Sequence, residues 1–177
     1  MEVGKCIKER RSIRKYKDKI IEWKKITEIL DCARFTPAAG NIQNWRFILV
    51  SDKDKKEKLA KAALKQYFIE ESAYIIVVCR DDKELKRFYR KRADLYGVQN
   101  TAAAIQNIML RAHSLGLGTC WIGAFDEQAV KSALKIVGDI HVDGMITLGY
   151  PNEKVKAPKR MDLRDMVYFE EWKNTSK

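Results

Sequence analysis

Cysteine and histidine are scarce in this chain, which limits the metal and redox chemistry that its side chains can carry. The 177 residues include 4 cysteines and 2 histidines. The cysteines are widely separated: Cys6, Cys32, Cys79 and Cys120. No two of them have the C-x-x-C spacing of a zinc knuckle or a dithiol redox centre, and we interpret neither His113 nor His141 as a metal ligand. We therefore expect small buried thiols in a reducing compartment, and no metal site.

Long apolar runs are also missing. The first ten residues, MEVGKCIKER, lack the apolar stretch of a secretory signal, and no run approaches the roughly 20 apolar residues that span a bilayer. With 46% hydrophobic and 33% charged residues, the chain suits one globular domain, which we expect to cover residues 1–177. We expect a cytoplasmic protein without membrane contact.

Positive charge is in excess, with a formal net charge of +11. Much of it comes from lysines that alternate with acids, as in DKDKKEKLAKAALKQ, and this mixing is typical of solvated helix faces. The sequence has no helix-turn-helix, zinc-finger or aromatic RNA-binding signature. A basic nucleic-acid-binding domain without redox activity therefore stays a less favoured alternative.

The usual glycine-rich phosphate loops are absent. Gly116, Gly118 and Gly123 fall in GLGTCWIG, which follows a predicted helix and enters a predicted strand, the reverse of a dinucleotide-binding fingerprint. There is no GxxxxGK[ST] motif either. Any phosphate that the protein binds must be held by other residues.

Apolar spacing predicts helices and strands that are interspersed without a regular βαβ alternation. We expect helices over 2–10, 21–35, 97–118 and 126–136, where Gly116 stops the third. We expect strands at 45–50 and 73–79, strand-containing segments at 119–125 and 141–150, and an irregular tail after Pro151. In the third helix one buried stripe is predicted: Val98, Ala102, Ile105, Met109 and Ala112. This mixture indicates an α+β fold.

Two polar stretches are candidates for ligand binding. In RRSIR, Arg10, Ser12 and Arg14 alternate, so an extended backbone points them to one side, where guanidinium forks and a hydroxyl can hold phosphate. A solvated charged stretch is the alternative. In TPAAGNIQNW, residues 36–45, amide side chains at a strand entrance suit a planar hydrogen-bonding ring. The alternative there is an ordinary turn whose Trp45 packs in the core.

Together these stretches resemble the nitroreductase family of flavoproteins. The family's R-R-S-x-R motif appears at 10–14, its P-[SA]-[AS]-x-N-x-Q-P-W motif at 37–45, its Q-N to G-L-G helix at 106–118, and its basic tail pair at 159–160. The four motifs follow the family's order and span nearly the whole chain.

Two positions depart from the family pattern. Asn44 stands where the family usually has proline, so we expect a less rigid turn. Gly123 stands where members with a Pro-x-Glu-Gly stretch have an acid. At Gly123 only backbone contacts to a flavin are therefore expected.

The resemblance implies a nitroreductase-like fold, with a central, mostly antiparallel sheet flanked by helices, in an intertwined homodimer. It implies one FMN per active site at the subunit interface. The alanine-rich stretch 101–115 and the aromatic tail segment MVYFEEW are the parts that we expect to pack against the second copy.

Specific residues carry over as candidates for holding FMN. They are Arg10, Arg11, Ser12, Arg14, Ala38, Ala39, Asn41, Gln66, Ile122, Gly123, Ala124, Lys159 and Arg160. The first three would hold the phosphate and ribityl end, joined by the tail pair. Arg14 would lie at the N1/O2 edge of the ring and the Gly123 backbone near N5, which makes these two the catalytic candidates.

The activity implied is a ping-pong reaction. NADH or NADPH would reduce the flavin and leave, and a nitroaromatic, quinone or related small oxidant would then take its place. Other reactions on the same fold stay open as alternatives: enone reduction, reductive dehalogenation and flavin fragmentation.

Overall fold

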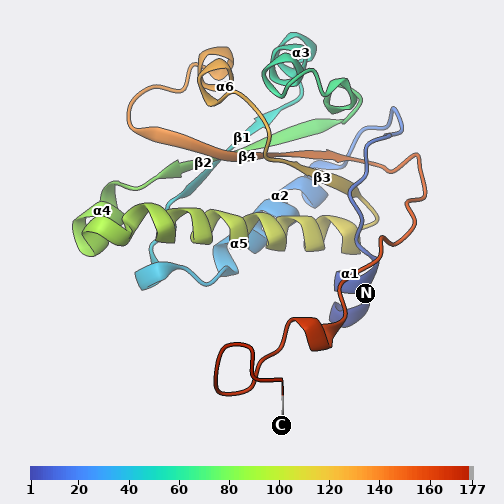
Figure 1. Ribbon diagram of the computed structural model, residues 1–177. Coiled ribbons are helices and arrows are strands. Elements are labelled where there is room, and N and C mark those ends of the chain that lie inside the picture. Colours follow the sequence, from blue (N-terminus) through green and yellow to red (C-terminus); the bar gives the residue numbers. More distant parts are fainter. Residues whose placement is uncertain (176–177) are drawn as a thin grey trace.

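The computed structural model describes residues 1–175, which fold around a four-stranded antiparallel sheet (Figure 1). The strand order across the sheet is β1-β2-β4-β3. The strands are β1 (Trp45–Val50), β2 (Tyr74–Asp81), β3 (Gly118–Ile122) and β4 (Ile140–Gly149). Every pair of neighbours is antiparallel. The predicted α+β fold with a mostly antiparallel sheet is therefore confirmed.

The central strand β2 explains why the molecule has two core layers. Its apolar run is buried, and successive side chains of a strand point to opposite faces. Ile76 and Val78 pack in the layer that contains the middle of the longest helix. Ile75 and Val77 pack in the layer on the other face. Both faces of the sheet are thus covered by helices.

The helices divide between these two faces (Figure 1). Helices α3 (Lys53–Ala62) and α6 (Glu127–Leu134) cover one face, and α2 (Trp23–Asp31) and α5 (Ala93–Ser114) cover the other. Two shorter helices pack against the ends of α5: α1 (Val3–Glu9) and α4 (Lys83–Tyr89). The helix predicted over 21–35 is shorter in the structure. Its α-helical part ends at Asp31, and the chain continues as a 3-10 turn over Cys32–Phe35.

The buried face of α5 differs from the predicted stripe. Ile105, Met109 and Ala112 are buried as expected, but Val98 is 47% exposed and Ala102 is half-buried, so these two assignments are wrong. The true buried face is turned by roughly a quarter of the helix circumference and includes Gly97, Asn100 and Thr101. Small and polar residues point inward here because they meet buried polar groups of the sheet, which an apolar pattern cannot reveal.

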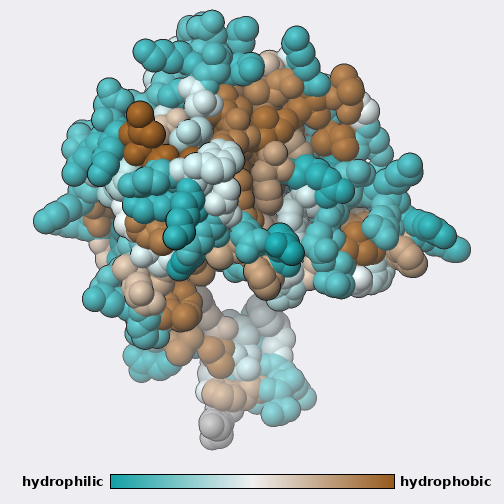
Figure 2. Space-filling model, turned by 180° about the vertical axis from the view of Figure 1, so that it is seen from behind, coloured by the Kyte–Doolittle hydropathy of each residue, from teal (hydrophilic) through white to brown (hydrophobic). Residues whose placement is uncertain are grey.

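The chain after Pro151 is irregular, as predicted, apart from a 3-10 turn at Leu163–Asp165. This tail passes α1 and then stands away from the rest of the subunit (Figure 1). From behind, an open gap separates the end of the tail from the rest of the molecule (Figure 2). In residues 1–175 no helix has the length and apolar character needed to cross a membrane.

Candidate functional site

Residues 10–16 extend the sheet beside its edge strand β3. The Ile13 amide donates to the Thr119 carbonyl at 2.9 Å, and Ser12 forms a parallel bridge with Thr119. Two glycines make room for this segment. A Cβ on Gly118 would lie 2.9 Å from Ile13, and one on Gly149 would lie 2.6 Å from the ring of Tyr16. The RRSIR motif is therefore held as an extended segment with one isolated bridge to β3.

Tyr16 anchors the end of this segment from inside the core. Its hydroxyl donates to the Ile13 carbonyl at 2.5 Å and lies 2.6 Å from Thr147 Oγ1. Burial raises the pKa of the Tyr16 phenol well above its usual value, so the group stays neutral and keeps its proton for the hydrogen bond. On the outer side, the Glu153 carboxylate accepts from the Arg14 amide at 2.5 Å and the Lys15 amide at 3.0 Å.

Ser12 is bridged to Thr119, the residue before Cys120 in β3, while Arg10 lines a pocket with Arg11 and Arg14 is exposed beside Phe68. The charges of Arg10 and Arg14 both influence the Cys120 thiol. Burial raises the pKa of Cys120, while Arg14, a side-chain hydrogen bond with Ser12 and the charge of Arg10 lower it. That Arg10, Ser12 and Arg14 point to one side stays a prediction from their alternation.

Gln66 is linked to the end of β3, and Phe68 of the same turn lies next to Arg14. Its guanidinium carbon is 5.8 Å from the centre of the Phe68 ring, and Gln66, two residues earlier, donates to the Ala124 carbonyl at 3.2 Å. Strand β3 ends at Ile122, after which the chain is exposed. A Cβ on Gly123 would meet no atom within 4 Å. Open space thus lies beside the backbone at this end of β3.

The Arg11 side chain turns back toward helix α1. Its Nη1 donates to the carbonyls of Lys8 and Arg10, both at 2.7 Å, and so binds the C-terminal end of α1. Its Nε is a buried donor with no hydrogen-bond partner among residues 1–175. Arg10 and Arg11 both line a pocket of about 350 Å³ that also includes His113. The unpaired donor beside a second arginine suits an anionic group.

The second predicted stretch forms a 3-10 turn at Ala39–Asn41, ahead of β1. Asn100 of α5 holds both ends of this turn, since its Oδ1 accepts from the Ala39 amide at 3.0 Å and its Nδ2 donates to the Ile42 carbonyl at 3.3 Å. Ala38 and Ala39 are half-buried, while Asn41 is exposed and its Oδ1 accepts from Gln43. Trp45 is buried in the core, as the plain-turn interpretation expected.

Asn44, in the place of the family's proline, is 2% exposed. Its Nδ2 donates to Asp82 Oδ1 at 2.9 Å, and its Oδ1 accepts from Asn100 at 3.1 Å. Hydrogen bonds of a buried side chain thus hold the turn where a proline ring would restrict it. The sequence predicts a less rigid turn in the absence of proline, but in the structure these hydrogen bonds constrain the turn instead.

One subunit separates the candidate residues into two groups. The turn at 39–41 is bonded to Asn100, in the N-terminal half of α5, whereas the 10–14 segment lies beside β3 and the C-terminal end of α5 (Figure 1). Asn100 and His113 are about 20 Å apart along the helix axis. In addition, the turn leads into β1, which is at the opposite edge of the sheet from β3. The two groups do not surround a common space within one chain.

The tail pair is not joined to either group. Lys159 and Arg160 are exposed, and no hydrogen bond or ion pair links them to residues 10–14 in the described part of the chain. The nearest link is Glu153, at the beginning of the tail.

Several residues that shape the site could not be predicted from the sequence. Tyr16, Thr147 and Glu153 hold the 10–14 segment, but no spacing rule connects positions so far apart in the chain. Another unforeseen group is that of Asp82, Asp94 and His141, whose ligand atoms lie within 4.8 Å of one another. Arg80 forms ion pairs with both carboxylates, so a guanidinium supplies positive charge in this cluster.

Comparison with known proteins identifies the family. The chain matches the Nitroreductase family model over residues 7–71 and 63–150. A protein of Archaeoglobus fulgidus, provisionally named an NADH dehydrogenase/NAD(P)H nitroreductase, is 35% identical over 175 residues, which cover 95% of this chain and 97% of the relative. The chain therefore belongs to the nitroreductase family, as the four motifs indicated.

Solved structures agree with this assignment. The FMN-dependent nitroreductase of Clostridium difficile R20291 superposes with a TM-score of 0.81 at 32% identity and covers 94% of this chain and 98% of its own. The NADPH:FMN oxidoreductase of Vibrio harveyi has the same fold, with a TM-score of 0.89 at 23% identity over 97% of this chain and 78% of its own.

Proposed function

We propose that this protein is an FMN-dependent oxidoreductase that takes electrons from NADH or NADPH and reduces nitroaromatics, quinones or related small oxidants. The observation that carries the proposal is the extended RRSIR segment, which is bridged to β3 at Ser12 and places Arg10 and the unpaired Nε of Arg11 at one pocket. The names of relatives support the NAD(P)H-dependent oxidoreductase activity and the cofactor, among them an FMN reductase [NAD(P)H] of Bacillus subtilis that is 25% identical.

The residues present suit FMN. Arg10, Ser12 and the unpaired Nε of Arg11 supply donors for the phosphate and ribityl end, and no glycine-rich dinucleotide loop is present for an adenylate. When bound, FMN supplies the hydride chemistry that links a nicotinamide to an oxidant. Lys159 and Arg160 would add positive charge at the phosphate end.

The remaining candidates would hold the ring. Arg14 places a positive charge at the N1/O2 edge, where negative charge gathers on reduction. The backbone of Ile122, Gly123 and Ala124 would lie near N5, and Gln66, which is bonded to this segment, would fix it from the side. Because Gly123 has no side chain, the ring face beside it is left open for the nicotinamide and the oxidant in turn.

The separation of the candidates into two groups supports an FMN site shared by two copies of the chain. In a two-fold homodimer, the 10–14 segment of one subunit can face the turn at Ala39–Asn41 of the other. The stretch 101–115, expected at the interface, is largely buried within its own subunit. The exposed apolar side chains of α5 lie nearer its N-terminal end, where Leu95 is 48% and Val98 47% exposed, and these suit an interface. We therefore propose a homodimer with Ala38, Ala39 and Asn41 supplied across the interface.

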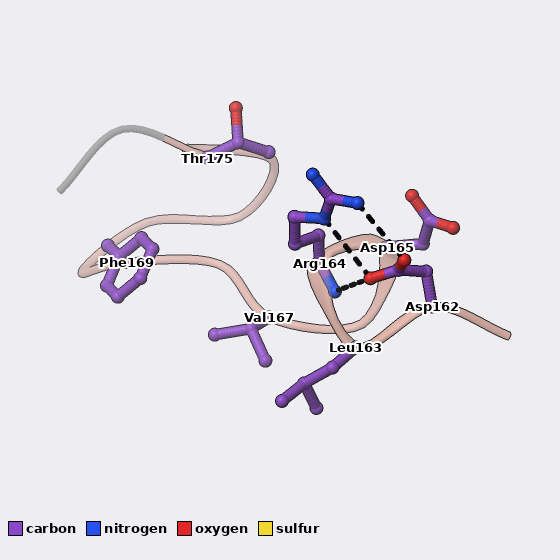
Figure 3. A pocket seen from close by; sticks show the side chains of 7 residues that line it. All are labelled: Asp162, Leu163, Arg164, Asp165, Val167, Phe169 and Thr175. Atoms are coloured by element: carbon purple, nitrogen blue, oxygen red, sulfur yellow. Dashed lines mark hydrogen bonds and ion pairs between the residues drawn. The ribbon is translucent and has the colours of Figure 1, made fainter.

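The tail gives independent support for a second copy. An open hollow of about 700 Å³ is lined by seven residues, all between Asp162 and Thr175 (Figure 3). Leu163, Val167 and Phe169 are among them, and no residue from the body of the subunit lines it (Figure 3). Trp172 is 79% exposed. These apolar side chains would be buried if the tail packed against the partner subunit.

Two measurements test the proposal. The flavin extracted from the purified protein should be FMN, and tight binding of FAD would contradict the clamp. In an anaerobic stopped-flow experiment NADH or NADPH should bleach the bound flavin, and a nitroaromatic or quinone should restore its colour. If neither nucleotide bleaches the holoprotein, the pyridine-nucleotide activity is refuted even though the family assignment stands.

We also propose the cytoplasm as the compartment, because all four cysteines are free thiols. Cell fractionation of the source organism tests this proposal. Recovery of the protein outside the cytoplasmic fraction would contradict it.

A further inference from the structure

A buried chain of side-chain hydrogen bonds leads from the sheet to the turn at Ala39–Asn41. It begins at Arg80 in β2 and passes through Asp82, Asn44 and Asn100 to the amide of Ala39. These four side chains belong to residues that are 6%, 1%, 2% and 4% exposed, respectively. Buried polar groups of this kind are costly unless they are fully paired, so the arrangement tolerates little rearrangement.

The direction of each hydrogen bond follows from the charge at one end. The Asp82 carboxylate is paired with Arg80 and can only accept, so the Asn44 side chain must turn its NH₂ group toward it. The carbonyl oxygen of Asn44 then faces Asn100, which must donate to it from its own NH₂ group. This leaves Asn100 Oδ1 as the acceptor for the Ala39 amide.

The turn at the end of this chain needs an external constraint. Gly40 and Asn41 both have a φ of 58°, in the left-handed region that a non-glycine residue adopts at some energetic cost. Asn100 bonds to the chain on both sides of these two residues, at Ala39 and at Ile42. A single side chain thus sets where the turn stands relative to α5.

At its other end the network is fixed to the sheet and to α5. Arg80 also pairs with Asp143 of β4, with Nε 2.9 Å from Oδ2, and Thr101 donates to the same carboxylate at 2.6 Å. Gly97 allows this close approach, because a Cβ there would lie 2.5 Å from Asp82 and 2.8 Å from Arg80. The network therefore fixes the position of the turn relative to β2, β4 and α5.

We propose that Asn44 and Asn100 are positioning residues for the flavin ring: through Asp82 they fix the turn that carries Ala38, Ala39 and Asn41 in the binding site of the partner subunit. This inference rests on the proposed FMN function. In this chain the side chains of Asn44 and Asn100, oriented by the Asp82 carboxylate, constrain the turn. The family pattern has a proline at position 44 instead.

The test compares FMN and riboflavin binding to the apoprotein, by fluorescence quenching, at a temperature where every variant is folded. Asn100→Ala should weaken both flavins about tenfold, because the turn serves the ring end and not the phosphate. Asn44→Ala should do the same, and the double variant should be little worse than either single variant, since both act in one chain. Arg10→Ala should weaken FMN but leave riboflavin nearly unchanged.

Ser72→Ala is the matched control for a purely structural loss. Ser72 is 1% exposed, and its hydroxyl donates to the Ile69 carbonyl at 2.7 Å, outside the network. It should lower the melting temperature without changing either dissociation constant. The inference is overturned if Asn100→Ala and Asn44→Ala bind both flavins as the parent does, if they weaken FMN alone, or if Ser72→Ala weakens flavin binding as much. A parent protein that binds neither flavin would instead refute the proposed function.

Discussion

At the scale of single residues, Arg14 is the side chain whose charge matters most for the proposed chemistry. It is exposed and stacks near Phe68, while its backbone amide is fixed by Glu153. Replacing the side chain should therefore leave the extended segment in place. Its charge can be tested separately from its position.

We predict that Arg14→Ala lowers the reduction potential of the bound flavin and slows its reduction by NAD(P)H. A charge interaction of about 1.4 kcal/mol corresponds to about 30 mV for a two-electron couple. Redox titration against a reference dye measures the shift, and the FMN dissociation constant serves as the control, because Arg10 and Ser12 keep the phosphate. An unchanged potential would contradict the role given to Arg14.

Gly123 allows a different test, because Gly123→Ala adds a methyl group and leaves every charge unchanged. A Cβ there meets no atom within 4 Å, so Gly123→Ala should fold as well as the parent or be slightly more stable, by about 0.4–1 kcal/mol. If the ring lies against this backbone, the methyl group should slow flavin reduction. Thermal melting and stopped-flow rates check the two parts. A variant that is both as stable and as fast as the parent would remove Gly123 from the site.

Glu22 makes a pH-dependent contribution at the start of α2. A hydrogen bond from Tyr150 and the neighbouring Lys25 lower the pKa of its carboxyl to about 2, from an ordinary value of 4.5. Because the folded-state pKa is lowered, the stabilisation is present above pH 4.5 and is lost as the pH falls toward 2. Glu22→Gln should therefore flatten the fall in stability over this interval in urea titrations. An identical acid profile in both proteins would contradict this assignment.

At the scale of elements, the 10–16 segment is held by Tyr16, whose hydroxyl is bonded inside the core. Tyr16→Phe should destabilise the protein by about 1–2 kcal/mol, because the Ile13 carbonyl and the Thr147 hydroxyl lose a buried partner. FMN affinity should fall as well, since the same hydroxyl holds the RRSIR motif at Ile13. Urea unfolding and flavin titration measure the two effects. A loss of stability with unaltered FMN affinity would show that Tyr16 does not position the clamp.

The elements also show how far sequence reasoning reaches. The strands at β1 and β2 follow from short β-branched runs, and α1 and α6 from local spacing, so their existence could be predicted. The buried face of α5 could not, because the inward-facing Asn100 and Thr101 bond to Asn44 and Asp143, which come from other parts of the chain. A pattern of apolar residues has no information about polar partners across the core.

The same contrast holds within the candidate site. The alternation of Arg10, Ser12 and Arg14 indicated a shared side, because that geometry is local to an extended chain. Tyr16 and Glu153 support the segment through contacts that only the folded chain creates. Asn44 was noted as a departure from the family, but its hydrogen bonds to Asp82 and Asn100 depend on how β1, β2 and α5 meet.

At the scale of the whole molecule, the two groups of candidate residues lie on opposite edges of the sheet, and the tail exposes apolar side chains. The proposed homodimer, in which each flavin contacts both chains, would account for both features. In this homodimer a complete flavin site would need the 10–14 segment of one chain and the 38–41 turn of the other.

Mixed dimers of two complementary variants test the shared site. One chain would carry Arg10→Ala with Arg14→Ala, and the other Ala38→Glu with Ala39→Glu, so that neither homodimer has an intact site. Dimers that contain one chain of each kind, isolated with two different affinity tags, should have one intact site. We predict about one FMN for every two chains in these mixed dimers, by absorbance, and almost none in either homodimer. Mixed dimers that bind no more FMN than the homodimers would contradict the shared site.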